Sequence, residues 1–548
     1  MADNSPENDP ASQNEAGTSD SNALRQGSSP DTGSFFRRPA IDPESPVPVS
    51  KKFKLFFCTH YRGVVAFVVP FIFISILAPF PPEDSVMMFL GSIMLASAVE
   101  QSGLHKRMAL YAIKVIGYSH YKMLFAVASV TMFISMWITN TAAVTMMVPI
   151  VFALLKVYES QKLFKMYNVN DKTGEKTATP LTSCYFCCIT YAATNGGIGT
   201  LVGTATNLVF KGLFATAYPT APEYISFPLF SVFAIPLMIV INMFMYFYLV
   251  ICYMGLFRPN SAAAKSVKIS ADGLTTAKKR VESDIKDLGP MSCHEIMVLC
   301  LFCLAILLFF SRSPQVFPGW ADRIREGYGI DNAKFIRDSA AATFVIFLML
   351  VFPSTSTMFQ NYKVKFVDEL PKGRIPSCLN WDVMNASLPY SFAFLLAGGF
   401  ALSTAAGKQY SDLNGKIGEG LQKLEGLPNP AILFIIIIFT IFVTNFASNV
   451  AVCNVITPIA MQLAANVNVN PLWYNIATGI AASFAFMIPV GTPGNLIVQS
   501  AANIPTSHMI IAGIGPTITT LFFTWLFTYF YAPVIWPIMN ESKPEWLA

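Results

Sequence analysis

A short polar pattern occurs twice in this chain, each time inside a strongly apolar segment. The string TNT at 139–141 lies in MWITNTAAVTMMVPI, and the string SNV at 448–450 lies in FVTNFASNVAVCNVITPIA. Each is followed by a Gly-Thr-x-x-Asn motif, which begins at Gly203 in the first case and at Gly491 in the second. The central asparagines of the two strings lie 309 positions apart (449 − 140 = 309), which indicates two related halves rather than a short structural repeat.

The composition places both strings at membrane depth. The chain is 53% hydrophobic and only 13% charged, and its mean hydropathy is +0.50, which is typical of a polytopic membrane protein. A helix that crosses the bilayer needs about 20 predominantly apolar residues. We therefore expect spans near residues 63–80, 86–104, 184–210, 227–257, 294–311, 340–353, 387–405, 472–502 and 509–538.

Two further apolar runs, 123–157 and 430–467, are too long for one simple span, and they contain the two polar strings. We interpret each as a re-entrant helical hairpin that enters and leaves the bilayer on the same side. Non-helical backbone is tolerated at that depth only where it is buried in protein or lines a wet cavity. The alternative is a pair of ordinary spanning helices joined by a tight turn.

The distribution of Lys and Arg predicts the orientation, because basic residues accumulate in cytoplasmic loops. Basic residues precede the first span and follow the second, and they recur in the loops 158–182, 258–292 and 354–378, all of which we expect inside. The loop 312–338 is an exception, since it falls outside but is also basic. Its basic residues are Arg312, Arg323, Arg325, Lys334 and Arg337.

The two ends of the chain differ in character. Residues 1–50 are rich in Ser, Pro, Asn and Asp and poor in aromatic residues, which predicts a disordered tail on the cytoplasmic side. The C-terminus is expected outside, where Asn540 begins an Asn-Glu-Ser tripeptide and is a candidate for glycosylation.

The residue types of the repeated strings suit an anion and small cations. Helices broken inside the membrane present unpaired N–H groups and a partial positive charge at their N-termini. Asn amides and Ser or Thr hydroxyls offer oxygen atoms to a cation and donors to a carboxylate. Acidic residues are nearly absent from these stretches, which favours an anionic substrate. Paired interruptions in two halves indicate the midplane site of a secondary transporter, with two cation sites beside one anion site.

Other classes of function find little support in the sequence. The chain contains no phosphate-binding P-loop and no H-E-x-x-H motif, and the embedded polar residues are mostly Ser, Thr and Asn. An ion channel would need rings of charge or a carbonyl filter. The net charge of +5 reflects cytoplasmic loops rather than a surface for nucleic acid. We therefore do not expect an enzyme or a nucleic-acid partner.

Several strings resemble a known family, the divalent anion/sodium symporters, and in particular its animal di- and tricarboxylate branch. They are FLGSIMLASAVEQSGLHKRMAL, SMWITNTAAVTMMVPI, GTLVGTATNLVFKG, FLLAGGFAL, TNFASNVAVCNVITPIA and IPVGTPGNLIV. The resemblance implies an all-α membrane protein with an inverted repeat, two re-entrant hairpins, a scaffold and a mobile transport domain that works as an elevator. It also implies a homodimer in the plasma membrane that carries succinate, citrate or related carboxylates, with Na⁺ as coupling ion and no other cofactor.

The resemblance also divides the chain into segments. Scaffold spans would occupy 51–118 and 216–405, the second with a cytoplasmic loop. The transport domain would comprise 119–215 and 406–505, one hairpin in each. Residues 506–548 would form the last span and the extracellular C-terminus.

Carried over position by position, the resemblance implies three groups of site residues. The first sodium site would use Ser135, Thr139, Asn140 and Gly203. The second sodium site would use Thr444, Ala447, Asn449 and Gly491. The substrate carboxylates would contact Asn140, Thr141, Thr204, Ser448, Asn449, Thr492 and Pro493.

The chain departs from the family pattern at three places. Thr139 stands where the family usually has Ser, and Val450 stands where some bacterial relatives have Thr. Relatives carry two further spans, roughly 45 residues, before Asp84, where only PFPPED joins the first span to the second. Loss of two spans preserves the orientation but is expected to impair the scaffold and the dimer. A sulfate transporter and a cation-independent carboxylate exchanger remain alternatives.

Overall fold

The computed structural model describes residues 81–547, apart from 161–163, 170–175, several positions within 262–270, residue 316, 331–335, 356–375, 388–396 and most of 400–425. The expected tail at 1–50, the first span at 63–80 and most of the span at 387–405 lie outside the described residues.

The first part of the described chain is helical except for one short hairpin. Its helices are α2 (Pro81–Ser102), α3 (Leu104–Ile116), α4 (His120–Ser135), α5 (Asn140–Ser160), α6 (Pro180–Gly197), α7 (Ala205–Ala217), α8 (Phe227–Tyr253), α10 (Ala271–Asp287), α11 (Cys293–Ser311), α12 (Trp320–Gly327) and α13 (Asp338–Val351). Strands β1 (Tyr167–Val169) and β2 (Lys176–Ala178) pair antiparallel between α5 and α6. The expected all-α class is therefore correct apart from this hairpin.

The second part repeats the same succession of helices. Its elements are α15 (Trp381–Ser387), α18 (Asn429–Thr444), α19 (Asn449–Asn466), α20 (Pro471–Ala481), the 3₁₀ turn η4 (Pro489–Gly491), α21 (Pro493–Ala502), α22 (Thr506–Leu526), the π-helical η5 (Phe527–Tyr531), α23 (Ala532–Ile535), η6 (Pro537–Asn540) and η7 (Glu545–Leu547). Residues 120–217 and 429–502 thus each contain four helices that are separated by breaks at corresponding places.

Length and composition make four of the described helices suitable to cross a membrane. These segments are Asn140–Ser160, Phe227–Tyr253, Cys293–Ser311 and Thr506–Ile535. A fifth candidate is the pair α2–α3, whose axis bends by 68°. Gly103 lies at this bend with a φ of 76°, a left-handed conformation that glycine adopts without steric cost.

Two segments that the apolar pattern predicted as single spans are broken in the structure. The run 184–210 is divided between α6 and α7, with a break at 198–204, and the run 472–502 is divided between α20 and α21, with a break at 482–492. The expectation of single helices was wrong here because apolar residues continue through both breaks, so hydropathy does not register them. Each break ends within the repeated Gly-Thr-x-x-Asn motif.

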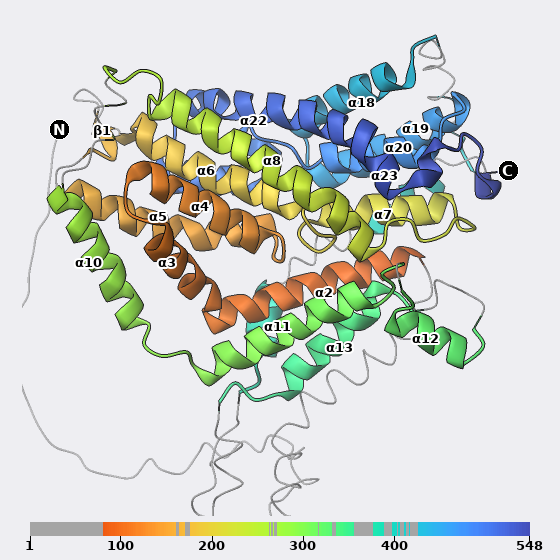
Figure 1. The fold of residues 1–548 in the computed structure, drawn as a ribbon, viewed down its shortest axis with the longest axis horizontal. Coiled ribbons are helices and arrows are strands. Elements are labelled where there is room, and N and C mark those ends of the chain that lie inside the picture. Colours follow the sequence, from red (N-terminus) through yellow and green to blue (C-terminus); the bar gives the residue numbers. More distant parts are fainter. Residues whose placement is uncertain are drawn as a thin grey trace, which may run out of the picture.

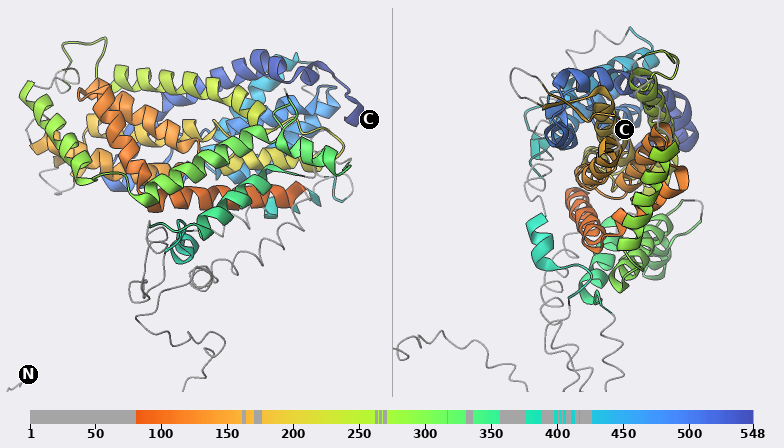
Figure 2. Two further views of the ribbon diagram at one scale, coloured as in Figure 1. Left: turned by 60° about the horizontal axis from the view of Figure 1, so that its bottom comes forward. Right: turned by 90° about the vertical axis from the view of Figure 1, so that its left-hand side faces the viewer.

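The helices form two packed groups (Figures 1 and 2). Helices α2, α11 and α13 pack against one another, while α4–α7 and α18–α21 form a larger group together with α8 and α22. Within the larger group the two halves interlock. Helix α7 of the first half packs on α19 and α20, and α21 of the second half packs on α5 and α6. Helix α7 also contacts α2, and so it borders both groups.

Two contacts hold α20 against α7. The Asn475 side-chain amide donates to the carbonyl of Phe210 over 3.0 Å, and both residues are buried. At Gly479, a Cβ atom would overlap the ring of Phe210. The two helices can approach this closely only because residue 479 has no side chain.

We therefore expect Gly479→Ala to destabilise the contact between the two halves. The added methyl must displace a fully buried ring, and overpacking of this kind costs about 1–3 kcal/mol. Thermal denaturation of the detergent-solubilised protein, followed by size-exclusion chromatography, measures the loss. Gly327→Ala is the matched control, because no atom lies within 4 Å of its Cβ position. Equal melting of the two variants would contradict the predicted packing.

Candidate functional site

Four helix N-termini lie at the repeated polar motifs. Helices α5 and α19 begin at Asn140 and Asn449, directly after breaks at 136–139 and 445–448. Helices α7 and α21 begin after Thr204 and Thr492, which are their N-cap residues. Each N-terminus carries unpaired N–H groups and the positive end of a helix dipole. The repeat therefore supplies two pairs of N-termini suited to negative charge.

In the first half, one hydroxyl joins three segments. Ser135 Oγ lies 2.9 Å from Asn140 Oδ1 and 2.7 Å from the carbonyl oxygen of Ala193. It thereby connects the end of α4, the start of α5 and the interior of α6. Gly197 lies against the same amide, since a Cβ atom at this residue would overlap Asn140 Oδ1.

Gly203 lies among backbone carbonyl oxygens. A Cβ atom at this residue would be 2.9 Å from Met136 O and 3.0 Å from Ser135 O, and closer still to Gly197 O. Neutral carbonyl and hydroxyl oxygens are the ligands that hard cations prefer, and Gly203 lets the chain approach them. With the Ser135 hydroxyl beside them, these atoms form an oxygen-rich group that fits the predicted first sodium site.

The second half repeats the arrangement of the first. Thr444 Oγ1 lies 2.8 Å from Asn449 Oδ1 and contacts the carbonyl oxygen of Ala482 at 2.6 Å. The amide nitrogen of Asn449 donates to Ser483 O over 3.2 Å. A Cβ atom at Gly491 would lie 3.1 Å from the carbonyl oxygen of Asn445. Hydroxyl, amide and carbonyl oxygens therefore meet at the second break as they do at the first.

The last residue of each Gly-Thr-x-x-Asn motif clamps the loop before it. Asn207 Nδ2 donates to Gly197 O at 3.0 Å and to Thr200 O at 2.7 Å. Asn495 Nδ2 donates to Ala485 O at 2.9 Å and to Ile488 O at 3.1 Å. Neither asparagine was among the predicted site residues, although their recurrence at the same place in both motifs was the available signal.

Asn495 also joins the two halves. Its Oδ1 accepts a hydrogen bond of 2.8 Å from Thr190 Oγ1 on α6. Next to it, a Cβ atom at Gly494 would lie 2.9 Å from Thr190 Oγ1 and 3.1 Å from Val144 on α5. The N-terminus of α21 thus packs directly against α5 and α6 of the first half.

The predicted substrate residues differ in their partners. Thr204, Ser448 and Thr492 are N-cap residues whose side chains make no capping hydrogen bond. Thr492 Oγ1 is buried without a hydrogen-bond partner among the described residues. These three hydroxyls are therefore not engaged in capping and suit a bound anion.

The remaining predicted residues lie at three of these helix starts, those of α5, α19 and α21. Thr139 Oγ1 accepts a bond of 3.4 Å from Ala142 N, and Thr141 is half-buried in the first turn of α5. Ala447 is half-buried in the second break, and Pro493 is exposed at the start of α21. The structure thus places the predicted residues in two groups, one in each half, and α21 of the second half packs on α5 and α6 of the first.

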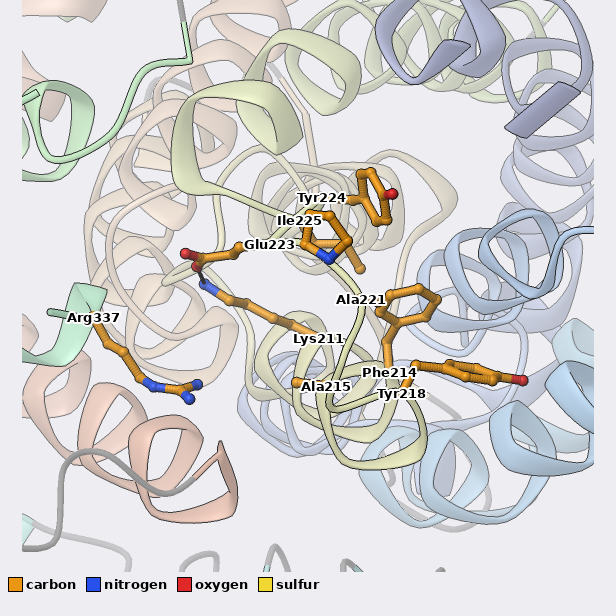
Figure 3. A pocket seen from close by; sticks show the side chains of 10 residues that line it. Lys211, Phe214, Ala215, Tyr218, Ala221, Glu223, Tyr224, Ile225 and Arg337 are labelled. Atoms are coloured by element: carbon orange, nitrogen blue, oxygen red, sulfur yellow. Dashed lines mark ion pairs between the residues drawn. The ribbon is translucent and has the colours of Figure 1, made fainter. Parts of the chain in front are cut away.

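A small cavity of about 30 Å³ lies elsewhere, near the C-terminal end of α7 (Figure 3). Its lining consists of Lys211, Phe214, Ala215, Tyr218, Ala221, Pro222, Glu223, Tyr224, Ile225 and Arg337. It has room for about one water molecule and contains none of the predicted site residues. We base the candidate site on the helix breaks and not on this cavity.

Apolar helices and paired, broken-helix loops that expose helix N-termini define a class of protein, the secondary transporters. The comparison with protein families agrees with this class. A family model described as the sodium:sulfate symporter transmembrane region matches residues 57–538. The chain belongs to this family, within its animal di- and tricarboxylate transporter branch, and is therefore a transporter and not an enzyme.

Three relatives illustrate the similarity. "Protein I'm not dead yet" of Drosophila melanogaster is 39% identical over 85% of this chain and 79% of its own length. The Na(+)/citrate cotransporter of Rattus norvegicus is 29% identical over 84% of each chain. The Na(+)/dicarboxylate cotransporter 3 of Mus musculus is 28% identical over 79% of this chain and 77% of its own length.

The loss of the two clamping asparagines is expected to reduce the stability of the protein to different degrees. Asn495→Leu removes the donor to Ala485 O and the acceptor of Thr190 Oγ1, whereas Asn207→Leu removes the donor to Gly197 O. The other carbonyl that each amide contacts keeps a hydrogen bond from a backbone N–H, Ile488 O from Gly491 and Thr200 O from Gly203. Each unsatisfied buried group costs about 1–3 kcal/mol. We expect Asn495→Leu to lower the melting temperature of the solubilised protein more than Asn207→Leu does.

Gln462→Leu is the control for this series, because among the described residues its side chain bonds only to Asn466 within α19. It is expected to melt close to the unmodified protein. Melting of Asn495→Leu at the temperature of this control would show that the clamp has no structural role.

Proposed function

We propose that this protein is a Na⁺-coupled transporter of di- and tricarboxylates, such as succinate and citrate, in the plasma membrane. The observation that carries the proposal is the repeated bridge of hydroxyl, Asn and carbonyl, Ser135 with Asn140 in one half and Thr444 with Asn449 in the other. Each bridge lies directly before a helix N-terminus. The arrangement offers neutral oxygens to Na⁺ and N–H groups to a carboxylate.

Two cation sites and one anion site follow from this arrangement. The first Na⁺ would contact Ser135, Thr139, Asn140 and Gly203, and the second would contact Thr444, Ala447, Asn449 and Gly491. The carboxylates of the substrate would contact Asn140, Thr141, Thr204, Ser448, Asn449, Thr492 and Pro493. The positive charge of bound Na⁺ stabilises the anion beside it, which couples their transport.

Helix lengths support re-entrant hairpins for 123–157 and 430–467. Helices α4 and α18 have 16 residues each and so extend about 24 Å, less than the hydrocarbon core of about 30 Å. Helix α5 has 21 residues and would be long enough to cross alone. The hairpins would move with 119–215 and 406–505 as the transport domain of an elevator, against a scaffold at 51–118 and 216–405.

Two further parts of the proposal concern assembly and topology. The protein is expected to form a homodimer through its scaffold, with the N-terminus in the cytoplasm and the C-terminus outside. Asn540, the candidate for glycosylation, is exposed at the end of η6. A shift in electrophoretic mobility after glycosidase treatment, lost in Asn540→Gln, tests the outside position.

Substitution of the two central asparagines tests the substrate site. Asn140→Ala and Asn449→Ala each remove an amide that we expect to contact both Na⁺ and a carboxylate. Loss of a hydrogen bond to a charged group costs about 1.5–3 kcal/mol, which corresponds to a loss of about 10-fold to 100-fold in affinity. We expect saturable uptake of labelled citrate and succinate to fall by at least tenfold in each variant.

Gln462→Ala is the control for uptake, and all rates are normalised to the amount of protein at the cell surface. Uptake that survives in both asparagine variants would refute the assigned site.

Labelled sulfate in the same assay tests the family's other substrate class. Uptake that needs no Na⁺ but is accelerated by internal carboxylate would identify an exchanger.

The Thr444 hydroxyl gives a sharper test of sodium coupling. Thr444→Val removes the hydroxyl and keeps the shape, whereas Thr444→Ser keeps the hydroxyl. We expect the Na⁺ concentration for half-maximal uptake to rise about tenfold in Thr444→Val, since a Na⁺ ligand is lost, and to stay within about twofold in Thr444→Ser. The titration replaces Na⁺ by choline at constant ionic strength. An equal response of the two variants would exclude Thr444 as a sodium ligand.

The family resemblance implies two further spans before Asp84, which this chain lacks. Their loss would impair the scaffold without altering the motifs of the site. If the chain reaches the cell surface but does not transport, insertion of the two spans should restore uptake. Failure of this insertion to restore uptake would count against the proposed carboxylate transport.

A further inference from the structure

A cluster of buried charges lies beside the middle of α7, at Lys211. Lys211 Nζ is 2.7 Å from Asp338 Oδ2 and 2.9 Å from Glu223 Oε1. Arg312 contacts the same two acids, through Nη2 to Glu223 at 2.9 Å and through Nε to Asp338. Figure 3 shows Lys211 and Glu223 pointing toward each other at the edge of the small cavity.

Three of the four charges of the cluster are well shielded from solvent, whereas the Glu223 side chain is 22% exposed. The side chains of Arg312 and Asp338 are 2% and 1% exposed, and that of Lys211 is 10% exposed. Burial by itself would raise the pKa of Glu223, but the neighbouring Arg312 and Lys211 lower it to about 2, so this carboxylate is charged at physiological pH. Removal of one partner from such a cluster would leave an uncompensated buried charge.

The positions of these residues in the fold are more informative than the pairs themselves. Lys211 lies one turn after Asn207, on the helix whose N-terminus belongs to the candidate site. Asp338 is the first residue of α13, and Arg312 directly follows α11. Helices α11 and α13 belong to the group that also contains α2. Lys211 therefore connects a helix of the site to the other packed group of the molecule.

Lys211 can separate from the cluster while the other three residues stay in contact. Without Lys211, both carboxylates still contact Arg312, and Asp338 stays at the N-terminus of a helix, where a negative charge is favourable. Lys211 is the only one of the four residues that lies in α7. Separation of α7 from α11 and α13 thus breaks the two ion pairs of Lys211 and leaves both acids in contact with a single cation, Arg312.

We propose that Lys211 is a releasable latch, which holds the site helix α7 against α11 and α13 in this conformation and must part from Asp338 and Glu223 during each transport cycle. The inference rests on the proposed function, because it assigns α7 to the moving domain and α11 and α13 to the scaffold. The ion pairs of Lys211 stabilise this conformation relative to the other one. Because they must break before the conformation changes, their strength affects the rate at which the protein leaves this conformation.

A reversible link across the latch tests this inference. Lys211→Cys and Asp338→Cys are combined, and a short bifunctional thiol reagent with a cleavable disulfide joins the two positions. We expect complete linking to lower citrate and succinate uptake at least tenfold, and reduction to restore it. Each single-cysteine variant, treated with the same reagent, controls for the native cysteines. Uptake within twofold of the unlinked protein would overturn the latch.

Arg107 and Glu295 provide a matched pair for this experiment. They form another buried ion pair, at 3.0 Å, and both lie in segments assigned to the scaffold, on α3 and α11. The double-cysteine variant at these positions, linked in the same way, should keep its uptake within about twofold. An equal loss in both linked proteins would mean that linking impairs transport without regard to the latch.

A second variant needs no cysteine and keeps the cluster balanced. Lys211→Met with Glu223→Gln removes one cation and one anion and retains the contact of Arg312 with Asp338. We expect the maximal uptake rate to change at least threefold while KM stays within twofold, since the latch does not contact substrate. An unchanged rate, or a change confined to KM, would overturn the proposal. Absence of uptake in the unmodified protein that persists after insertion of the two spans would instead refute the proposed function, and the latch with it.

Discussion

The structure depends on how polar backbone is accommodated where helices break within apolar segments of the chain. Each break leaves N–H and carbonyl groups without a partner in their own helix, and these groups must be paired elsewhere. This chain meets the requirement with side chains from neighbouring segments, Ser135 and Asn140 in the first half and Thr444 and Asn449 in the second. The loops after α6 and α20 are fixed in turn by Asn207 and Asn495. The groups that make the breaks tolerable are the same groups that could hold ions, so stability and binding share one set of atoms.

Much of this arrangement was predictable from the sequence. The repeat of TNT and SNV, each with its Gly-Thr-x-x-Asn motif, indicated two halves, the broken helices and the residues at their ends. Hydropathy failed at 184–210 and 472–502, because apolar residues continue through both breaks. The partners of the breaks were also beyond prediction, since Ala193 and Ala482 contribute only backbone carbonyls. Nothing in a sequence distinguishes an alanine whose carbonyl is used in this way.

The charge pattern shows a related limit. The loop 312–338 conflicted with the positive-inside rule as an outside segment with five basic residues. In the structure Arg312 is buried against Glu223 and Asp338, and Arg337 is buried as well. Residues that are paired inside the protein carry little information about orientation, so part of the conflict disappears. The rule counts charges along the chain, whereas the bilayer responds to those that remain unpaired near its surface.

The two clamping asparagines are related by the repeat but are not equivalent. Asn495 is held through both ends of its amide, since Thr190 of the other half donates to its Oδ1, whereas Oδ1 of Asn207 is buried without a partner in the described part of the chain. The asparagine that clamps the loop before α21 is therefore also held by the first half, through Thr190. The asparagine that clamps the loop before α7 bonds to carbonyl groups of its own half. Two loops related by the repeat are thus held by unequal numbers of hydrogen bonds, three at Asn495 and two at Asn207. Internal repetition of the sequence does not make the two halves mechanically equal, because each copy has its own neighbours.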